Sequence, residues 1–173
     1  MSSPVRVFIA CSLDGFIAGP DDDLSWLPEP PEGEDFGYGA FMASTAALLM
    51  GRNSYDVVAA FDAWPYGETP VFVATTRPLE PVAETVRAVS GDPAALLAAV
   101  RAETDGGIYL DGGALIRAFL DAGLVDELTV SVIPIVLGAG APLFAGTARR
   151  HALALQDVTA MAGGLVQLRY RPA

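Results

Sequence analysis

The segment IYLDGGALIRAFLDAG, residues 108–123, passes directly from a strand pattern into a helix pattern. Residues 108–110 are large and apolar or aromatic, which predicts a buried strand. Asp111-Gly112-Gly113 then predicts a turn, and residues 114–122 predict a helix that ends at Gly123. A strand that runs through a short turn into a helix is the repeating unit of an α/β sheet. We therefore expect the chain to build a mostly parallel sheet.

The same alternation extends outward on both sides of this segment. Strand patterns cover residues 5–11, 48–50, 70–74, 86–89 and 126–133. Helix patterns cover residues 35–47, 55–60 and 92–103. Two final strands, 153–158 and 165–170, flank a Gly163-Gly164 turn and predict an antiparallel hairpin at the edge of the sheet. No repeat or linker divides the chain, so we expect residues 1–173 to form one α/β domain.

The amino-acid composition excludes several classes of protein and several kinds of binding partner. The 173 residues are 52% hydrophobic and carry ten Arg, no Lys and 21 acidic side chains, for a net charge of −11. This hydrophobic content excludes a disordered chain, and the charge argues against binding to nucleic acid or to an anionic membrane. A single cysteine, Cys11, and a single histidine, His151, exclude an internal disulfide and a zinc site of ordinary spacing. Because the sequence shows neither the pattern of a signal peptide nor an apolar run long enough to span a membrane, we expect a cytoplasmic protein.

Three turns that follow predicted strands carry residues suited to binding an anion. They are Gly51-Arg52-Asn53-Ser54, Thr75-Thr76-Arg77 and Asp111-Gly112-Gly113. In a parallel sheet these turns meet at one edge, where the ligands of open α/β sheets bind. Helix N-termini offer free N–H groups, glycines let a phosphate approach the backbone, and Arg binds phosphate oxygens in pairs. Each turn alone is also compatible with ordinary turn chemistry, so the expected phosphate site depends on all three together.

Five motifs, in order along the chain, resemble those of the dihydrofolate reductase superfamily. They are ACSLDGFIA at 10–18, LLMGRNSY at 48–55, TTRP at 75–78, YLDGG at 109–113 and DELTVSVIPIVLGAGAPLF at 126–144. The chain most resembles the branch of the reductase domain of bacterial bifunctional riboflavin biosynthesis proteins, over residues 5–171. The resemblance implies a three-layer α/β/α fold and a homodimer. It also implies reduction of a small pterin-, pyrimidine- or flavin-precursor-like substrate by hydride from NADPH.

The resemblance further assigns residues to the cofactor. Arg77 would bind the 2′-phosphate of NADPH, and Arg52 would lie along the pyrophosphate and that 2′-phosphate. Gly112 and Gly113 would lie under the pyrophosphate. Asp111 departs from the glycine-rich turn of dihydrofolate reductases but suits the riboflavin-type branch. The residues expected to bind NADPH are Ala10, Ile17, Gly51, Arg52, Asn53, Ser54, Thr75, Thr76, Arg77, Asp111, Gly112, Gly113, Ala114 and Leu115.

One further residue, Asp35, is assigned to catalysis, and three others, Asp14, Trp26 and Ser131, are assigned to the substrate. Asp35 stands where dihydrofolate reductases have the carboxylate that relays a proton, at the start of the helix that leads to Met50-Gly51-Arg52. A carboxylate at a helix start is also a common cap, so both interpretations stay open. Ser131 resembles the hydroxyl that supports this carboxylate, and Trp26 resembles the tryptophan beside the nicotinamide. Asp14 either lines the pocket or is an ordinary turn aspartate before Gly15.

Two other segments receive no catalytic role. The acidic, proline-rich residues 19–34 predict a surface loop inserted into the domain, with Trp26 as an anchor. Gly138-Ala139-Gly140 lacks the third glycine of a dinucleotide-binding fingerprint, and Pro142 would interrupt the helix that such a fingerprint needs.

Three functional hypotheses follow. The first is an NADPH-dependent reductase. The second is a protein of the same fold that binds a nucleotide-like ligand or a drug without turnover, and the third is an unrelated α/β phosphate-binding domain. Absence of thermal stabilisation by NADPH and NADH would count against the first, and a preference for simple phosphorylated ligands would favour the third.

Overall fold

The computed structural model of the chain describes residues 3–173. The strands are β1 (Val5–Ser12), β2 (Phe16–Ala18), β3 (Thr45–Gly51), β4 (Val71–Ala74), β5 (Val86–Val89), β6 (Gly107–Asp111), β7 (Glu127–Ile133), β8 (Ala141–Pro142), β9 (Leu153–Ala160) and β10 (Val166–Pro172). The helices are α1 (Tyr38–Ala43), α2 (Arg52–Ala59), α3 (Pro93–Arg101) and α4 (Gly113–Asp121). Short 3₁₀ turns cover Pro20–Asp22 and Ala162–Gly164.

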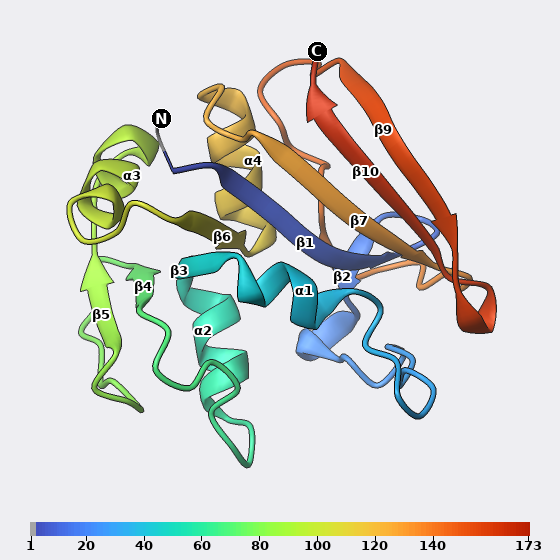
Figure 1. Cartoon of the computed structure of the whole chain (residues 1–173), viewed down its shortest axis with the longest axis horizontal. Helices are drawn as coiled ribbons and strands as arrows, with labels where there is room; N and C mark the ends of the chain where they lie inside the picture. The colour runs from blue at the N-terminus through green and yellow to red at the C-terminus, as the bar shows by residue number, and fades with distance from the viewer. Residues whose placement is uncertain (1–2) are drawn as a thin grey trace.

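Eight strands form one sheet in the order β5-β4-β3-β6-β1-β7-β10-β9 (Figure 1). Neighbouring strands from β5 to β7 are parallel, whereas β10 is antiparallel to both β7 and β9. This confirms the predicted mainly parallel sheet with a C-terminal hairpin at its edge. A second, antiparallel sheet of β2 and β8 is not apparent from the sequence, because these strands are only three and two residues long.

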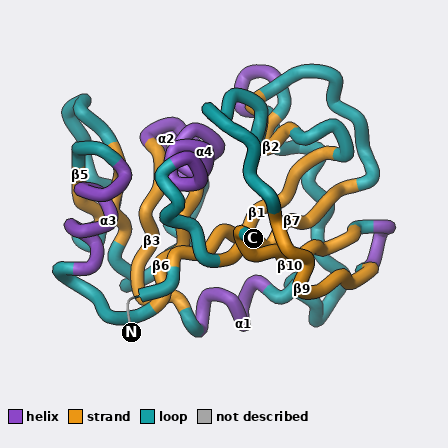
Figure 2. Tube along the Cα trace, turned by 90° about the horizontal axis from the view of Figure 1, so that it is seen from above, coloured by secondary structure: helices purple, strands orange, loops and turns teal. Residues whose placement is uncertain are grey.

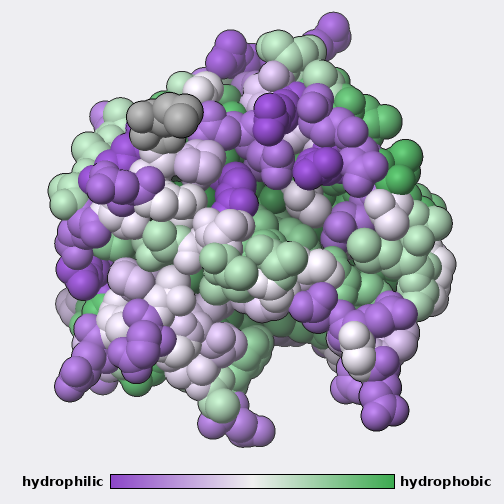
Figure 3. All heavy atoms as spheres, in the orientation of Figure 1, coloured by the Kyte–Doolittle hydropathy of each residue, from purple (hydrophilic) through white to green (hydrophobic). Residues whose placement is uncertain are grey.

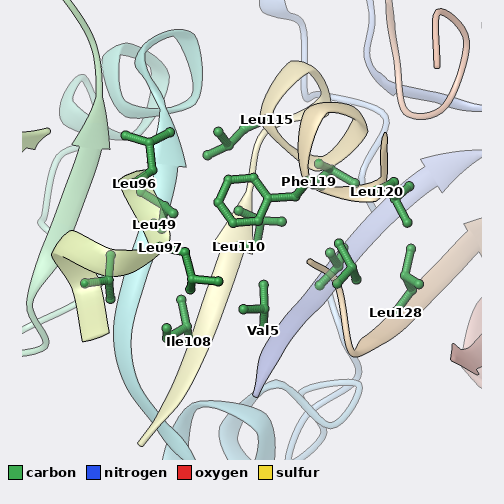
Figure 4. Packing of buried hydrophobic residues seen from close by; sticks show 14 of the residues in the cluster. Val5, Leu49, Leu96, Leu97, Ile108, Leu110, Leu115, Phe119, Leu120 and Leu128 are labelled. Carbon is green, nitrogen blue, oxygen red and sulfur yellow. The ribbon is translucent and has the colours of Figure 1, made fainter. Parts of the chain in front are cut away.

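Helices cover both faces of the parallel part of the sheet. α3 and α4 pack on one face, where the ring of Phe119 lies over Leu110 (Figure 4). α1 and α2 pack on the other face, and Figure 2 shows α1 and α4 on opposite sides of the sheet. Successive residues of a strand point to opposite faces, so Leu49 belongs to the first cluster and Leu48 to the second. The three-layer α/β/α arrangement is thereby confirmed.

The helix predicted at 35–47 is wrong in its length, because α1 covers only Tyr38–Ala43. The hydroxyl groups of Ser44 and Thr45 donate to the carbonyl oxygen of Phe41 at 2.9 and 3.0 Å. These bonds compete with continuation of the helix and end it. The apolar run that follows is extended, so β3 begins at Thr45, three residues before the predicted strand.

The parallel strands β4, β3, β6 and β1 all end at the same edge of the sheet. The turns after β3 and β6 lead directly into α2 and α4, so the N-termini of both helices lie at that edge. In the described part of the chain, residues 3–173, we find no helix with the length and apolar character needed to cross a membrane.

Candidate active site

A cavity of about 920 Å³ opens at the carboxyl edge of the sheet, among the ends of β1, β3, β4 and β6 and the starts of α2 and α4. Its volume lies at the upper end of the range for ligand sites. All fourteen residues that the resemblance assigns to NADPH line this cavity. Turns that lie far apart in the sequence therefore meet in one site, as their position after parallel strands predicts.

Two arginines converge at the end of the cavity beside β3 and β4. Arg52 donates from Nε to Asp56 Oδ1 at 2.8 Å and from Nη1 to the carbonyl oxygen of Pro78 at 3.0 Å. Arg77 Nη2 lies 3.5 Å from Asp56 Oδ2, and the backbone N–H of Arg77 donates to Thr75 Oγ1 at 3.1 Å. Both guanidinium groups line the cavity, whereas Asp56 holds them from outside it. Their charge makes this end of an acidic protein favourable for an anion.

Bare backbone lines the middle of the cavity, where β6 turns into α4. Gly112 has a φ of +100°, which favours glycine, and a Cβ there would lie 2.8 Å from Ser54 Oγ. A Cβ on Gly113 would lie 2.6 Å from the carbonyl oxygen of Pro142. Glycine at both positions keeps the start of α4 free of side chains, so a phosphate can approach its N–H groups.

Replacing Gly113 by alanine is expected to destabilise the protein by about 1–3 kcal/mol, because the added methyl group must displace the backbone of β8. The same displacement should weaken dinucleotide binding, since Pro142 lines the cavity. Chemical denaturation measures the first effect and a fluorescence titration with NADPH measures the second. Unchanged stability of the variant would contradict the close contact between α4 and β8.

Asp111 ends β6, the strand between β3 and β1, and also lines the cavity. Its Oδ1 accepts the backbone N–H of Gly112 at 2.9 Å. Burial raises the pKa of this carboxyl to about 6, although the hydrogen bond from Gly112 acts in the opposite direction. Burial also raises the pKa of the phenols of Tyr38 and Tyr66, and the charge of Asp111 adds to this effect. A carboxyl with this pKa can hold a proton near neutral pH.

The end of the cavity beside β1 is apolar. The apolar residues that line it are Ile9, Ala10, Ile17, Leu24 and Leu27. The two leucines belong to the predicted surface loop 19–34, which folds against the cavity and also contributes the exposed Asp22. A shielded apolar surface suits an uncharged ring.

Sequence reasoning misses several residues of the cavity, among them Leu24, Leu27 and Arg117. Arg117 lies on α4 one turn after Gly113, and its Nη1 donates to the carbonyl oxygen of Pro142 at 2.6 Å. The available signal for Arg117 is its i+4 spacing from Gly113, which puts both residues on one face of the helix. The leucines carry no comparable signal, because their place depends on the path of a long loop.

Neither the catalytic candidate Asp35 nor the three residues assigned to the substrate line this cavity. Asp14 accepts the backbone N–H groups of Leu137 and Gly138 at 3.0 and 2.7 Å, and so ties the turn after β1 to the loop after β7. Trp26 donates from Nε1 to the carbonyl oxygen of Asp23 at 3.0 Å, and so stabilises its own loop.

Asp35 and Ser131 lie near each other on the α1 side of the sheet, outside the cavity. Both carboxylate oxygens of the exposed Asp35 accept backbone N–H groups, from Gly37 at 2.9 Å and Gly39 at 2.7 Å. These two bonds stabilise the turn that leads into α1, whose N-cap is Gly37. Gln167 Nε2 donates to Ser131 Oγ at 3.1 Å and to the carbonyl oxygen of the residue after Asp35 at 3.0 Å. The hydroxyl of Ser131 therefore does not support the carboxylate directly.

Replacing Asp35 by alanine is expected to destabilise the protein by about 0.5–2 kcal/mol through loss of the two hydrogen bonds that its carboxylate accepts at the start of α1. The affinity for NADPH and the turnover should stay close to wild type, because this side chain does not line the cavity. Thermal unfolding and steady-state kinetics measure these quantities. A fall in turnover far larger than the fall in NADPH affinity would instead support the proton-relay role that the resemblance assigns.

A sequence profile of the RibD C-terminal domain matches residues 4–167, and the chain belongs to this family. It is 34% identical to the uncharacterised protein YwjB of Bacillus subtilis (strain 168), over 98% of each chain. A crystal structure from Shewanella sp. PV-4, assigned to riboflavin biosynthesis, matches with a TM-score of 0.89 at 34% identity and covers 98% of this chain and 99% of that one.

More distant structures share the fold. A Thermotoga maritima protein named as a deaminase and a 5-amino-6-(5-phosphoribosylamino)uracil reductase has a TM-score of 0.73 at 16% identity, and the match covers 99% of this chain and 57% of that one. Dihydrofolate reductase of Enterococcus faecalis, solved with NADP(H), has a TM-score of 0.66 at 16% identity, with 98% and 96% covered. The predicted dihydrofolate reductase-like fold and the resemblance to the riboflavin branch are therefore confirmed.

Proposed function

We propose that this protein is an NADPH-dependent reductase of a small heterocycle of the pyrimidine type. The observation that carries the proposal is the order of chemical groups along the edge of the sheet. Arginines stand beside β4 and β3, bare backbone and a helix N-terminus follow at β6, and apolar side chains lie at β1 and β2. NADPH presents a 2′-phosphate, a pyrophosphate and an uncharged nicotinamide ring in the same order.

The spacing of the strands supports this match. Neighbouring strands lie about 4.8 Å apart, so β4 and β1, which are three strand positions apart, are separated by about 14 Å. A dinucleotide in an extended conformation spans a distance of this order. The start of α4 lies between the two ends, where the N–H groups of a helix N-terminus suit the pyrophosphate.

The family supports the choice of substrate class. The Thermotoga maritima protein is named as a reductase of an aminouracil derivative, and this chain belongs to the RibD C-terminal domain family. A nitrogen heterocycle would stack against the apolar end of the cavity, beside β1, where the nicotinamide ring would also lie.

NADPH supplies a hydride when it is bound. The residues of the chain would hold the cofactor, exclude water and provide the proton that completes a two-electron reduction. We assign the proton to Asp111, because this residue lines the cavity and burial raises its pKa to about 6. The carboxyl would give its proton to a nitrogen or oxygen atom of the substrate and would then regain one from solvent.

Protein-dependent oxidation of NADPH, followed by absorbance with a panel of aminouracil and pterin compounds, tests the proposal. We expect oxidation with at least one compound, and a lower rate with NADH. Binding of NADPH without oxidation by any compound would favour the hypothesis of a binding protein without turnover. If neither dinucleotide binds, both hypotheses fail.

A further inference from the structure

The C-terminal hairpin of β9 and β10 has one apolar face because of a bulge in β9. The pairing shifts by one residue between Arg169 and Tyr170, which leaves Gln156 as the extra residue of β9. Strict alternation would put Leu155 and Val158 on opposite faces, but the extra residue brings both to the same one. Paired residues of antiparallel strands share a face. The residues of this face, which we call the apolar hairpin face, are Leu153, Leu155, Val158, Ala160, Val166, Leu168, Tyr170 and Pro172.

The opposite face of the hairpin is mostly polar. Its residues are Ala154, Asp157, Thr159, Gln167, Arg169 and Arg171. Figure 3 looks onto this side, the side of α1, and shows hydrophilic atoms over β10. Hydrophobic atoms appear at the upper right rim of the same view, where β9 is the edge strand of the sheet. One face of the hairpin is therefore suited to water, and the other is suited to contact with an apolar surface.

The apolar hairpin face continues the core of the domain but loses its cover toward the edge of the sheet. Leu168 pairs with Val130 of β7, which is buried in the cluster under α3 and α4. In Figure 1 the hairpin extends to the right of α4, beyond the part of the sheet on which this helix packs. Val130 is accordingly 5% exposed, whereas Leu155 and Val158 of the edge strand are 54% and 55% exposed. A long apolar edge that stays this exposed indicates a surface that binds another molecule.

Surface area and charge both favour a second copy of the chain as that molecule. The chain exposes 9110 Å², whereas a compact monomer of 18.0 kDa exposes about 8,000 Å². The excess of about 1,000 Å² is similar to the roughly 800 Å² that each partner contributes to a stable interface. Two copies that each carry a net charge of −11 repel each other, so they can meet closely only where the surface is uncharged. The apolar hairpin face carries no charged side chain, and a two-fold axis would bring this same face of both copies together.

We propose that two copies of the chain form a two-fold symmetric dimer through their apolar hairpin faces. Leu155 and Val158 of one copy would pack against the apolar hairpin face of the other, and the polar face of each hairpin would stay in water. The cavity would stay open in the dimer, because the described residues that line it include none from β9 or β10. The inference does not depend on the proposed reductase activity, since it uses no residue of the cavity.

Sedimentation of the full chain over a range of concentrations tests the proposal. We expect the wild-type chain to have a mass of about 36 kDa, twice the 18.0 kDa of one chain. Val158→Arg should raise the Kd of the dimer about 100-fold or more, because a charge on each copy would be buried against an apolar surface and close to its own counterpart. A wild-type chain that is still monomeric at about 100 μM, or a Val158→Arg variant that dimerises as tightly as wild type, would overturn the proposal.

Thr159→Arg is the matched control, because it adds the same charge to the next exposed residue of β9 but on the polar face. It should leave the dimer intact, and circular dichroism should show that both variants are folded. Equal weakening by the two substitutions would contradict contact through the apolar hairpin face. If Val158→Arg does not fold, Leu155→Gln takes its place, since it removes apolar contact at a half-exposed position without adding a charge. It should raise the Kd about tenfold, and an unchanged Kd would overturn the proposal.

Discussion

Replacing both Arg52 and Arg77 by glutamine is expected to weaken NADPH binding about 100-fold and to change NADH binding by less than about threefold. The two guanidinium groups line the end of the cavity beside β3 and β4, and NADPH differs from NADH only in its 2′-phosphate. A hydrogen bond to a charged group contributes about 1.5–3 kcal/mol, so the loss of two such partners accounts for this effect. Titration of the dinucleotide, followed by its fluorescence, measures both affinities.

The matched control replaces Arg169 and Arg171 of β10 by glutamine. These side chains are exposed, lie in the C-terminal hairpin far along the sheet from β3 and β4, and carry the same total charge. Their loss should change either affinity little, because salt screens charges at long range. An equal loss of NADPH and NADH affinity in the variant that lacks Arg52 and Arg77 would mean that these arginines stabilise the fold and do not bind the 2′-phosphate.

Replacing Asp111 by asparagine is expected to lower turnover about 100-fold or more and to leave NADPH affinity within about threefold of wild type. The amide is close in shape to the carboxyl but cannot release a proton to the substrate. The wild-type rate with saturating NADPH should fall as the pH rises through about 6, because the carboxyl then loses the proton that it must give. The variant should lack this dependence. A variant with unchanged turnover, or a wild-type rate that is constant across this pH range, would contradict the role of Asp111.

Replacing Asp111 by asparagine should also stabilise the folded protein above about pH 6. Burial raises the pKa of Asp111 from its usual 3.8 to about 6, so the folded state keeps a proton that the unfolded chain has already lost. Wild-type stability should therefore decrease as the pH rises from about 4 to 6, by about 1–3 kcal/mol, and asparagine should remove this decrease. Thermal unfolding of both proteins across this pH range separates the effect on stability from the effect on turnover.

Most of the fold is predictable from the sequence because its signals are local. Asp92 illustrates this: its Oδ1 accepts the N–H of Ala95 at 2.8 Å, and α3 begins at the proline that follows it, as the cap pattern predicts. The helix predicted at 35–47 is too long, because the spacing of apolar residues does not show where side-chain hydrogen bonds end a helix. The hydroxyls of Ser44 and Thr45 end α1, and Ala47 pairs with Ile108 of β6 as part of β3.

The cofactor side of the site is predictable for the same reason. Its residues stand in short turns directly after strands, and the parallel sheet alone brings those turns together. The substrate side depends on longer-range contacts. Asp14 bonds to Leu137 and Gly138, Trp26 bonds within its own loop, and Leu24 reaches the cavity only through the path of that loop. The homodimer and the cytoplasmic location implied at the outset stay predictions.

The most direct measurement of the central claim is a titration of the wild-type chain with NADPH and NADH at neutral pH and low salt. If the arginines at β3 and β4, the glycines at β6 and the apolar surface at β1 form one dinucleotide site, NADPH should bind about tenfold or more tightly than NADH, and added salt should reduce that preference. Equal affinity for the two dinucleotides, or binding of neither, would contradict it.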